Sequence, residues 1–274
     1  MNTQIVLAVM VAASALAPAA RAGELFGVDI TLPNRLLRID RDTAASEVVG
    51  ATNVPEWMNG LTYDPVGNVL YGLNPGTKSL YRIDRTTGRA TVVGTPGRLG
   101  FGNANGLAYD PIARVLYGTD NFTNALFTID TATGVGTRVA DITGGFTEIE
   151  GLGYDPFTRT LFGLTQLQSR VVTIDTATGL ATGLPVALPP GVWRGLDFDT
   201  ERRVLYGTTE GLLTTLYRID PTTGAATRVG DLPGTVAVQG LAYVPEPGGV
   251  TAALLAGAAA LLRRRRVTVR PARA

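Results

Sequence analysis

A phrase of fourteen residues recurs along the chain at nearly constant spacing, and no other feature limits the possible folds as strongly. Four copies read GLTYDPVGNVLYGL, GLAYDPIARVLYGT, GLGYDPFTRTLFGL and GLDFDTERRVLYGT, and a fifth copy, GLAYV, breaks off after five residues. Successive copies are 46, 45, 44 and 45 residues apart, and they start at Gly60, Gly106, Gly151, Gly195 and Gly240. A period of this length with many short strand-like segments is typical of β-propeller blades.

A second phrase, of which LYRIDRTTG is one copy, keeps the same step and occurs in five versions. Each complete unit reads as four strands, because segments rich in branched and aromatic residues alternate with turn residues. In both phrases an aspartate stands where a tight turn is expected, and such an aspartate accepts hydrogen bonds from nearby backbone N–H groups. We therefore expect a structural use, rather than acid–base chemistry or calcium binding, for Asp40, Asp64, Asp84, Asp110, Asp130, Asp155, Asp175, Asp199 and Asp220.

The first unit lacks an opening strand, whereas residues 240–244 form an opening strand with no unit after it. We expect this orphan strand to pair beside residues 25–28 and to complete the first unit from the other end of the chain. Closing the ring in this way removes two strand edges that would otherwise be free to aggregate. The sequence therefore predicts an all-β fold, a five-bladed β-propeller over residues 23–244.

Both ends of the chain differ in composition from the repeats. Residues 1–22 contain an apolar run and end in Ala-Arg-Ala, which predicts a signal peptide cleaved after Ala22, with an uncleaved N-terminal anchor as the alternative. Residues 248–262 are uncharged and precede four arginines, Arg263 to Arg266. Such a segment predicts a short transmembrane helix with the propeller on the outer side of the membrane, and a buried C-terminal helix is the alternative.

The last thirty residues, 245–274, resemble a PEP-CTERM sorting signal. The resemblance rests on the order of three features: Pro245-Glu246-Pro247, the apolar segment, and the cluster Arg263, Arg264, Arg265 and Arg266. It implies export, transient anchoring, cleavage near Pro245 to Pro247 by an exosortase-type membrane protease of Gram-negative bacteria, and delivery to the cell surface or extracellular matrix. The repeats themselves resemble bacterial surface propellers with YVTN-like or WD-like blades.

Composition excludes several kinds of chemistry. The chain has no histidine and no cysteine, which removes Ser-His-Asp and Cys-His catalysis and zinc sites built on imidazole. Residues 23–262 hold 17 basic and 23 acidic side chains, a net charge of −6, and this balance argues against binding of nucleic acid. We expect no metal and no cofactor.

One end of the predicted channel is the candidate ligand site. A polar residue directly precedes the glycine that opens each unit, and these residues should form a ring: Asn59, Asn105, Glu150, Arg194 and Gln239. Trp57 and Trp193 belong to the same loops, and aromatic faces beside amides and carboxylates suit sugar-like or peptide ligands. The alternative is that the ring bonds to itself or to ordered water and plugs the channel.

Two functions are compatible with these residues. The first is a binding or scaffold protein of the cell surface, associated with exopolysaccharide or with a surface protein. It needs only a variable surface for its ligand and a signal that directs it to the cell surface. The second is a glycoside hydrolase, which would need two carboxylates about 5 to 10 Å apart at the channel mouth. For the hydrolase, Glu150 would be the acid and Asp29, Asp120 or Glu148 its partner. The sequence favours the binding protein and assigns no catalytic residue.

Overall fold

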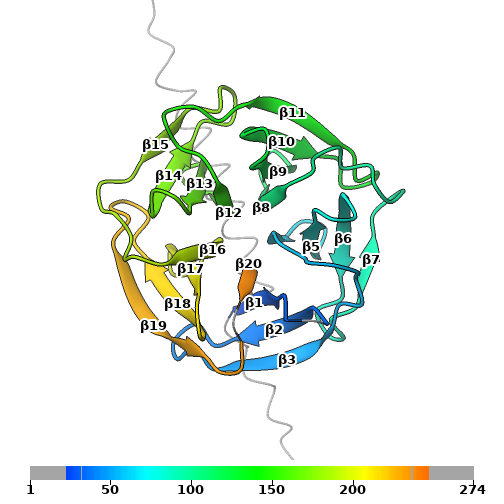
Figure 1. Cartoon of the computed structure of the whole chain (residues 1–274), viewed down its shortest axis with the longest axis horizontal. Helices are drawn as coiled ribbons and strands as arrows, with labels where there is room; N and C mark the ends of the chain where they lie inside the picture. The colour runs from blue at the N-terminus through cyan, green and yellow to red at the C-terminus, as the bar shows by residue number, and fades with distance from the viewer. Residues whose placement is uncertain (1–22, 32, 236, 247–274) are drawn as a thin grey trace, which may run out of the picture.

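The computed structural model of the chain describes residues 23–31, 33–235 and 237–246. These residues form twenty strands in five four-stranded antiparallel sheets, which surround a central axis like blades (Figure 1). The prediction of a five-bladed propeller is therefore confirmed. The predicted signal peptide, Pro247, the apolar segment and the arginine cluster lie outside the described residues. Within the three described stretches, no helix is long and apolar enough to span a membrane.

Each blade runs from an innermost strand near the axis to an outermost strand at the rim. Blade 1 contains β20 (Val238–Val244), β1 (Glu24–Asp29), β2 (Arg35–Ile39) and β3 (Ser46–Ala51). Blade 2 contains β4 (Leu61–Asp64), β5 (Val69–Asn74), β6 (Ser79–Ile83) and β7 (Ala90–Val92). Blade 3 contains β8 (Ala104–Asp110), β9 (Val115–Asp120), β10 (Ala125–Ile129) and β11 (Gly136–Asp141).

The last two blades repeat this order. Blade 4 contains β12 (Ile149–Asp155), β13 (Thr160–Thr165), β14 (Arg170–Ile174) and β15 (Ala181–Gly183). Blade 5 contains β16 (Val192–Asp199), β17 (Val204–Glu210), β18 (Thr214–Ile219) and β19 (Ala226–Leu232). The innermost strands contact one another in the ring order β20, β4, β8, β12 and β16, so the channel is lined by one strand from each blade.

The ring closes through β20, the last strand of the described chain. It pairs antiparallel with β1, and Leu25 lies opposite Tyr243 while Val28 lies opposite Gly240. This pairing confirms the prediction for residues 240–244. All seven residues of β20 are buried, because the strand lies between β1 and the other innermost strands.

The glycine that opens each repeat is explained by the close approach of neighbouring innermost strands. A Cβ atom at Gly151 would lie 2.6 Å from both the carbonyl oxygen of Arg194 and the backbone nitrogen of Leu196 in the next blade. Backbone atoms cannot move away from such a contact, whereas the end of a flexible side chain can. Glycine at this place therefore sets how closely the blades pack around the axis.

The turn aspartates have the structural role expected of them. In the Asp-Pro turn of blade 3, Asp110 Oδ1 accepts hydrogen bonds from the backbone nitrogens of Ile112 at 2.8 Å and Ala113 at 3.0 Å. In the Asp-x-x-Thr-Gly turn of the same blade, Asp130 Oδ1 accepts from Ala132 and Thr133 in the same manner. The turn ends at a glycine with positive φ, Gly134.

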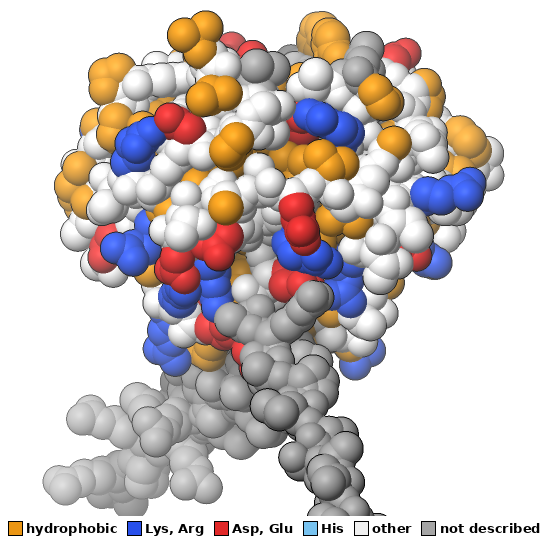
Figure 2. Space-filling view, turned by 90° about the horizontal axis from the view of Figure 1, so that it is seen from below, with side chains coloured by type: hydrophobic (Ala, Val, Ile, Leu, Met, Phe, Trp, Pro, Cys, Tyr) orange, Lys and Arg blue, Asp and Glu red, His pale blue; other side chains and the backbone are white. Residues whose placement is uncertain are grey.

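The contact between blades 5 and 1 carries a group of buried charges. Arg41 is buried and pairs with Asp199 at 2.6 Å and with Glu201 at 2.9 Å, while its guanidinium stacks on Tyr243 of the closing strand. Further out, Arg38 pairs with Glu24 and Glu47. In the side view of Figure 2, acidic and basic side chains lie next to one another over the lower half of the molecule. The pairs of Arg41 hold the closing blade to its neighbour, whereas those of Arg38 join strands within blade 1.

Candidate functional site

The two ends of the channel are built from different loops. At one end lie the Asp-Pro turns after the innermost strands, and we call it the Asp-Pro end. At the other end, the loops that enter the innermost strands meet the hairpins between the second and third strands, and we call it the mouth. A cavity of about 740 Å³ opens at the mouth, and we call it the mouth cavity.

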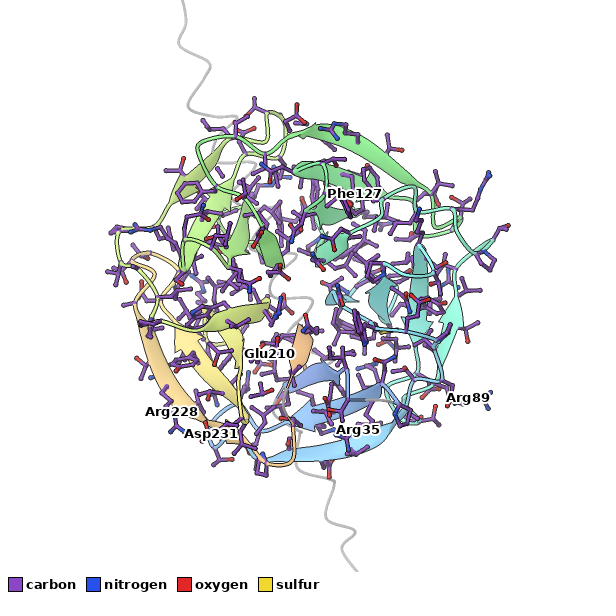
Figure 3. The ribbon with its side chains drawn as sticks, in the orientation of Figure 1. Arg35, Arg89, Phe127, Glu210, Arg228 and Asp231 are labelled. Atoms are coloured by element: carbon purple, nitrogen blue, oxygen red, sulfur yellow. The ribbon has the colours of Figure 1, made fainter. Side chains whose placement is uncertain are left out.

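All five residues of the predicted polar ring line the mouth cavity: Asn59, Asn105, Glu150, Arg194 and Gln239. Trp57 lines it as well, and 59% of this side chain is exposed. The sequence prediction did not include three further carboxylate and amide groups from the hairpins, Asn121, Gln166 and Glu210, which also line the cavity. Figure 3 shows Glu210 near the inner end of blade 5, close to the axis. The structure thus brings the predicted ring together and adds polar groups from three hairpins to it.

The floor of the mouth cavity is the innermost layer of the repeats. It consists of the Gly-Leu pairs of the five innermost strands together with Glu150 and Gln239, and it leaves no room for a water-sized molecule. The channel is therefore a closed-bottomed cavity rather than a pore. A ligand that enters from the mouth stops at this floor.

The ring residues bond to one another without filling the cavity. The side-chain amide of Asn59 donates to Asn105 Oδ1, and that of Asn121 donates to Glu150 Oε1 at 3.0 Å. Arg194 donates from Nε to Glu210 at 2.8 Å and from Nη1 to Glu150 at 3.3 Å. The self-bonding ring that was the alternative is therefore present in part, but an open cavity remains above it.

Glu150 is the most deeply placed charge of the mouth cavity. Its side chain is only 9% exposed, and burial raises the pKa of its carboxyl group, an effect that the nearby Arg194 guanidinium partly offsets. The Glu148 carboxylate raises the pKa of Glu150 further, because two like charges at close range disfavour ionisation. The cavity thus contains a carboxyl group that binds a proton more readily than an exposed glutamate.

Residues 99–244 match the model of a family described as a repeat of unknown function, DUF6923. The chain belongs to this DUF6923 repeat family. The matched segment contains blades 3, 4 and 5 together with β20, and so it includes Asn105, Glu150, Arg194 and Gln239 of the ring. No curated protein matches the chain.

Solved structures similar to this DUF6923 protein include the following two. The chain is similar to a chain in the crystal structure of a nidogen/laminin complex, with 16% identity over 82% of this chain and 98% of that chain, at a TM-score of 0.56. It is also similar to TolB from Acinetobacter baumannii, with 16% identity over 76% of this chain and 53% of that chain, at a TM-score of 0.48. At 16% identity, the likeness to the chain of the nidogen/laminin complex shows the fold alone.

The two tryptophans of the DUF6923 protein do not share the site, and the prediction for Trp193 is corrected. The strand β16 begins at Val192, so Trp193 is a strand residue rather than a loop residue. Its side chain is fully buried, its ring lies 4.9 Å from that of Tyr217, and its Nε1 donates to the carbonyl oxygen of Pro189 at 2.9 Å. Trp193 therefore packs in the core, and only Trp57 offers an aromatic face to a ligand.

Two of the three carboxylates considered as partners of Glu150 are engaged elsewhere. Asp29 is fully buried, accepts from Thr31, and pairs with Arg35. Asp120 accepts from the backbone nitrogens of Thr123 and Asn103, both at 2.8 Å. Neither lines the mouth cavity, whereas Glu148 does. Of the carboxylates considered, Glu148 alone shares the cavity with Glu150.

The Asp-Pro end of the DUF6923 propeller is closed by aromatic and proline side chains. Its cavity measures about 50 Å³ and is lined by the same aromatic position of every repeat: Tyr63, Tyr109, Tyr154, Phe198 and Tyr243. The Tyr154 hydroxyl donates to Asp110 Oδ2 of the preceding blade at 2.6 Å, which links two blades at a turn. This end is too small and too well packed to be the ligand site.

Proposed function

We propose that this DUF6923 protein is an exported binding protein of the cell surface and that the mouth cavity is its ligand site. The observation that carries the proposal is an open cavity of about 740 Å³, lined by side chains that differ from blade to blade, on a rigid scaffold. Ligand sites are commonly concave and placed on loops that a rigid fold positions.

The position of the chain ends supports display of the mouth. Glu24 lies opposite Val244 in the closing pair, and Pro245 lines the cavity of the Asp-Pro end. The described chain therefore begins and ends at the Asp-Pro end, opposite the mouth. A protein anchored through the segment that follows Glu246 would hold the mouth away from the membrane.

The proposed ligand is a polysaccharide of the cell surface or of the surrounding matrix. The lining is rich in side-chain amides, which can both donate to and accept from hydroxyl groups. Trp57 adds an exposed flat ring at the same cavity, and aromatic rings pack against the apolar faces of sugars. A protein that binds exopolysaccharide in this way can act as a scaffold in it, and that role requires no catalysis.

The proposed delivery to the cell surface rests on the resemblance of residues 245–274 to a PEP-CTERM sorting signal, with an exosortase-type membrane protease as the processing partner. Positive residues directly after an apolar segment keep that end on the cytoplasmic side. We expect replacement of Arg263, Arg264, Arg265 and Arg266 with glutamine to weaken membrane retention of the precursor. Fractionation of cells that express each form measures this, and an unchanged distribution would count against sorting.

Ligand binding is tested with the full-length chain on a glycan array, followed by titration with the best glycan. We expect Trp57→Ala to weaken binding about tenfold or more, because loss of an interface tryptophan often costs about 2 kcal/mol. Phe122→Ala is the matched control: its ring is 83% exposed on a mouth-side hairpin outside the cavity lining, so binding should be unchanged. Equal losses in both variants, or no glycan bound, would refute the proposed site. Cleavage of the glycan by the wild type but not by Glu150→Gln would identify a hydrolase instead.

A further inference from the structure

The wall of the mouth cavity carries an excess of negative charge. The charged side chains that line it are four carboxylates, those of Glu56, Glu148, Glu150 and Glu210, and one guanidinium, that of Arg194. Charges within a concave, partly dehydrated site interact more strongly than charges on an open surface, because less water screens them. A positively charged group is therefore the ligand chemistry that this wall favours.

The single cation of the wall is already engaged. Arg194 contacts Glu210 and Glu150 and also donates to Gln166 Oε1 at 3.3 Å. In the part of the chain that the structure describes, the carboxylates of Glu56 and Glu148 form no hydrogen bond and no ion pair. Two negative charges thus face the cavity without a partner of opposite sign.

A second observation, independent of charge, points to a polar ligand. Gln239 is only 8% exposed, and it lines both the mouth cavity and its floor. Its side-chain amide has no hydrogen-bond partner among the described residues, and its oxygen and nitrogen are not among the atoms closed off from solvent, so the amide is open to bond to whatever enters the cavity. A ligand that reaches the floor with a hydroxyl or amino group would satisfy this amide.

The remaining lining fits a sugar better than a peptide. Six side-chain amides line the cavity, and each offers a donor and an acceptor at short range, as sugar hydroxyls require: Asn59, Asn103, Asn105, Asn121, Gln166 and Gln239. Trp57 gives the cavity an exposed aromatic face. We propose, resting on the proposed function, that the mouth cavity selects a cationic polysaccharide, a polymer of amino sugars with free, protonated amino groups.

The test compares three probes on the full-length chain by titration calorimetry: a glucosamine oligomer, the N-acetylated oligomer of equal length, and an oligolysine of equal charge. The first should bind at least about tenfold more tightly than either other probe. Its amino groups form charge-assisted hydrogen bonds, roughly twice as strong as neutral ones, which the N-acetylated oligomer lacks, and its hydroxyl groups and rings suit the amides and Trp57, which oligolysine cannot match. Equal binding of the N-acetylated oligomer would overturn this inference but leave the proposed function standing. Equal binding of oligolysine would show that the cavity recognises charge without the sugar, and binding of no saccharide would refute both proposals.

Two variants locate the selectivity. Glu148→Gln and Glu56→Gln should each weaken binding of the glucosamine oligomer several-fold and leave binding of any N-acetylated oligomer unchanged. Glu47→Gln is the control, because it changes the net charge equally on β3, where Glu47 is 65% exposed. Binding should also weaken with added salt, since about 1 M salt reduces the screening length to about 3 Å. An equal effect of Glu47→Gln, or unchanged binding in both cavity variants, would place the selectivity outside the mouth cavity.

Discussion

The two ends of the channel use the repeat in opposite ways. At the Asp-Pro end, every blade contributes an aromatic residue at the same position, and together these residues leave only about 50 Å³. At the mouth, the residue before each repeated glycine varies among asparagine, glutamate, arginine and glutamine, and the cavity is about fifteen times larger. The repeated residues close and hold the ring, whereas the unrepeated residues surround the space that a ligand can enter.

Packing explains the difference. At the Asp-Pro end an aromatic side chain lies between two blades, and Tyr154 also bonds to the turn aspartate of its neighbour, so another residue type would lose area and a hydrogen bond. At the mouth the side chains extend into the cavity, where a change of type disturbs few packed atoms. If this contrast is correct, substitutions at the Asp-Pro end and along the axis change stability, and substitutions at the mouth change binding.

The largest effect is expected from removal of the closing strand. A chain that lacks residues 238–274 exposes the inner edge of β1 and leaves blade 1 incomplete, and single blades are not stable alone. We expect loss of cooperative thermal unfolding, measured by circular dichroism. A chain that lacks only residues 247–274 retains all twenty strands and is the control. Equal melting temperatures of the two truncated chains would contradict the closure argument.

An intermediate effect is expected from Asp197, a carboxyl group at the Asp-Pro end in a position where no other blade has a charged residue. It is buried beside the closing strand, accepts from the backbone nitrogen of Tyr243 at 2.6 Å, and burial raises its pKa to about 8. The folded state therefore binds this proton more tightly than the unfolded state, in which the pKa is about 4. Stability conferred by the proton is present at low pH and is lost as pH rises toward 8.

Asp197→Asn keeps an acceptor for Tyr243 and removes the titration. We expect the wild type to lose stability relative to this variant by about 1 kcal/mol for each unit of pH between about 5 and 8. Urea unfolding of both proteins over that pH range measures the difference between their free energies of unfolding. Titrations that the two proteins share cancel in this difference. A difference independent of pH would mean that the carboxyl group is ionised in the folded protein throughout.

The smallest effects are expected from removal of a single hydrogen bond at either end of the channel. Tyr154→Phe removes the buried bond to Asp110 and should lower the free energy of unfolding by about 1 kcal/mol. Asn121→Ala removes a bond to Glu150 at the partly solvated mouth and should change it by less than about 0.5 kcal/mol. Urea unfolding compares them, and a larger loss for Asn121→Ala would reverse the proposed division between the ends.

The sequence predicted the fold well because the fold repeats. A fixed period defined the blades, the broken copy at Gly240 predicted the closing strand, and the register with Leu25 to Val28 is as expected. The ring of polar residues was also predictable, since each one directly precedes a repeated glycine. A structural position that recurs in every blade is visible in one sequence without any relative for comparison.

The sequence did not predict the features that occur once. Trp193 seemed to lie in a loop because the innermost strand was expected to start at the repeated glycine, Gly195. The strand β16 begins three residues earlier, and a register shift between Trp193 and Leu196 follows its start. Glu56 belongs to a loop that has no counterpart at a common spacing. Glu210 does follow the repeat: it stands fifteen residues after Gly195, as Gln166 stands fifteen after Gly151, so this spacing could have placed it at the cavity. Asp197 stands where other blades have Thr62, Ala108 or Gly153, and only the packed neighbour shows that its charge is buried.

The closing strand also governs when the protein can become folded. The two partners in the closing pair, β1 and β20, lie at opposite ends of the described chain, so β1 is made first and its inner partner last. Contacts between residues so far apart in the sequence form slowly, because a long loop must be ordered first. Four blades can assemble as the chain emerges, but the inner edge of β1 stays open until the final residues arrive. During that interval β1 is the strand most exposed to wrong partners, and arrival of β20 ends the risk in a single step.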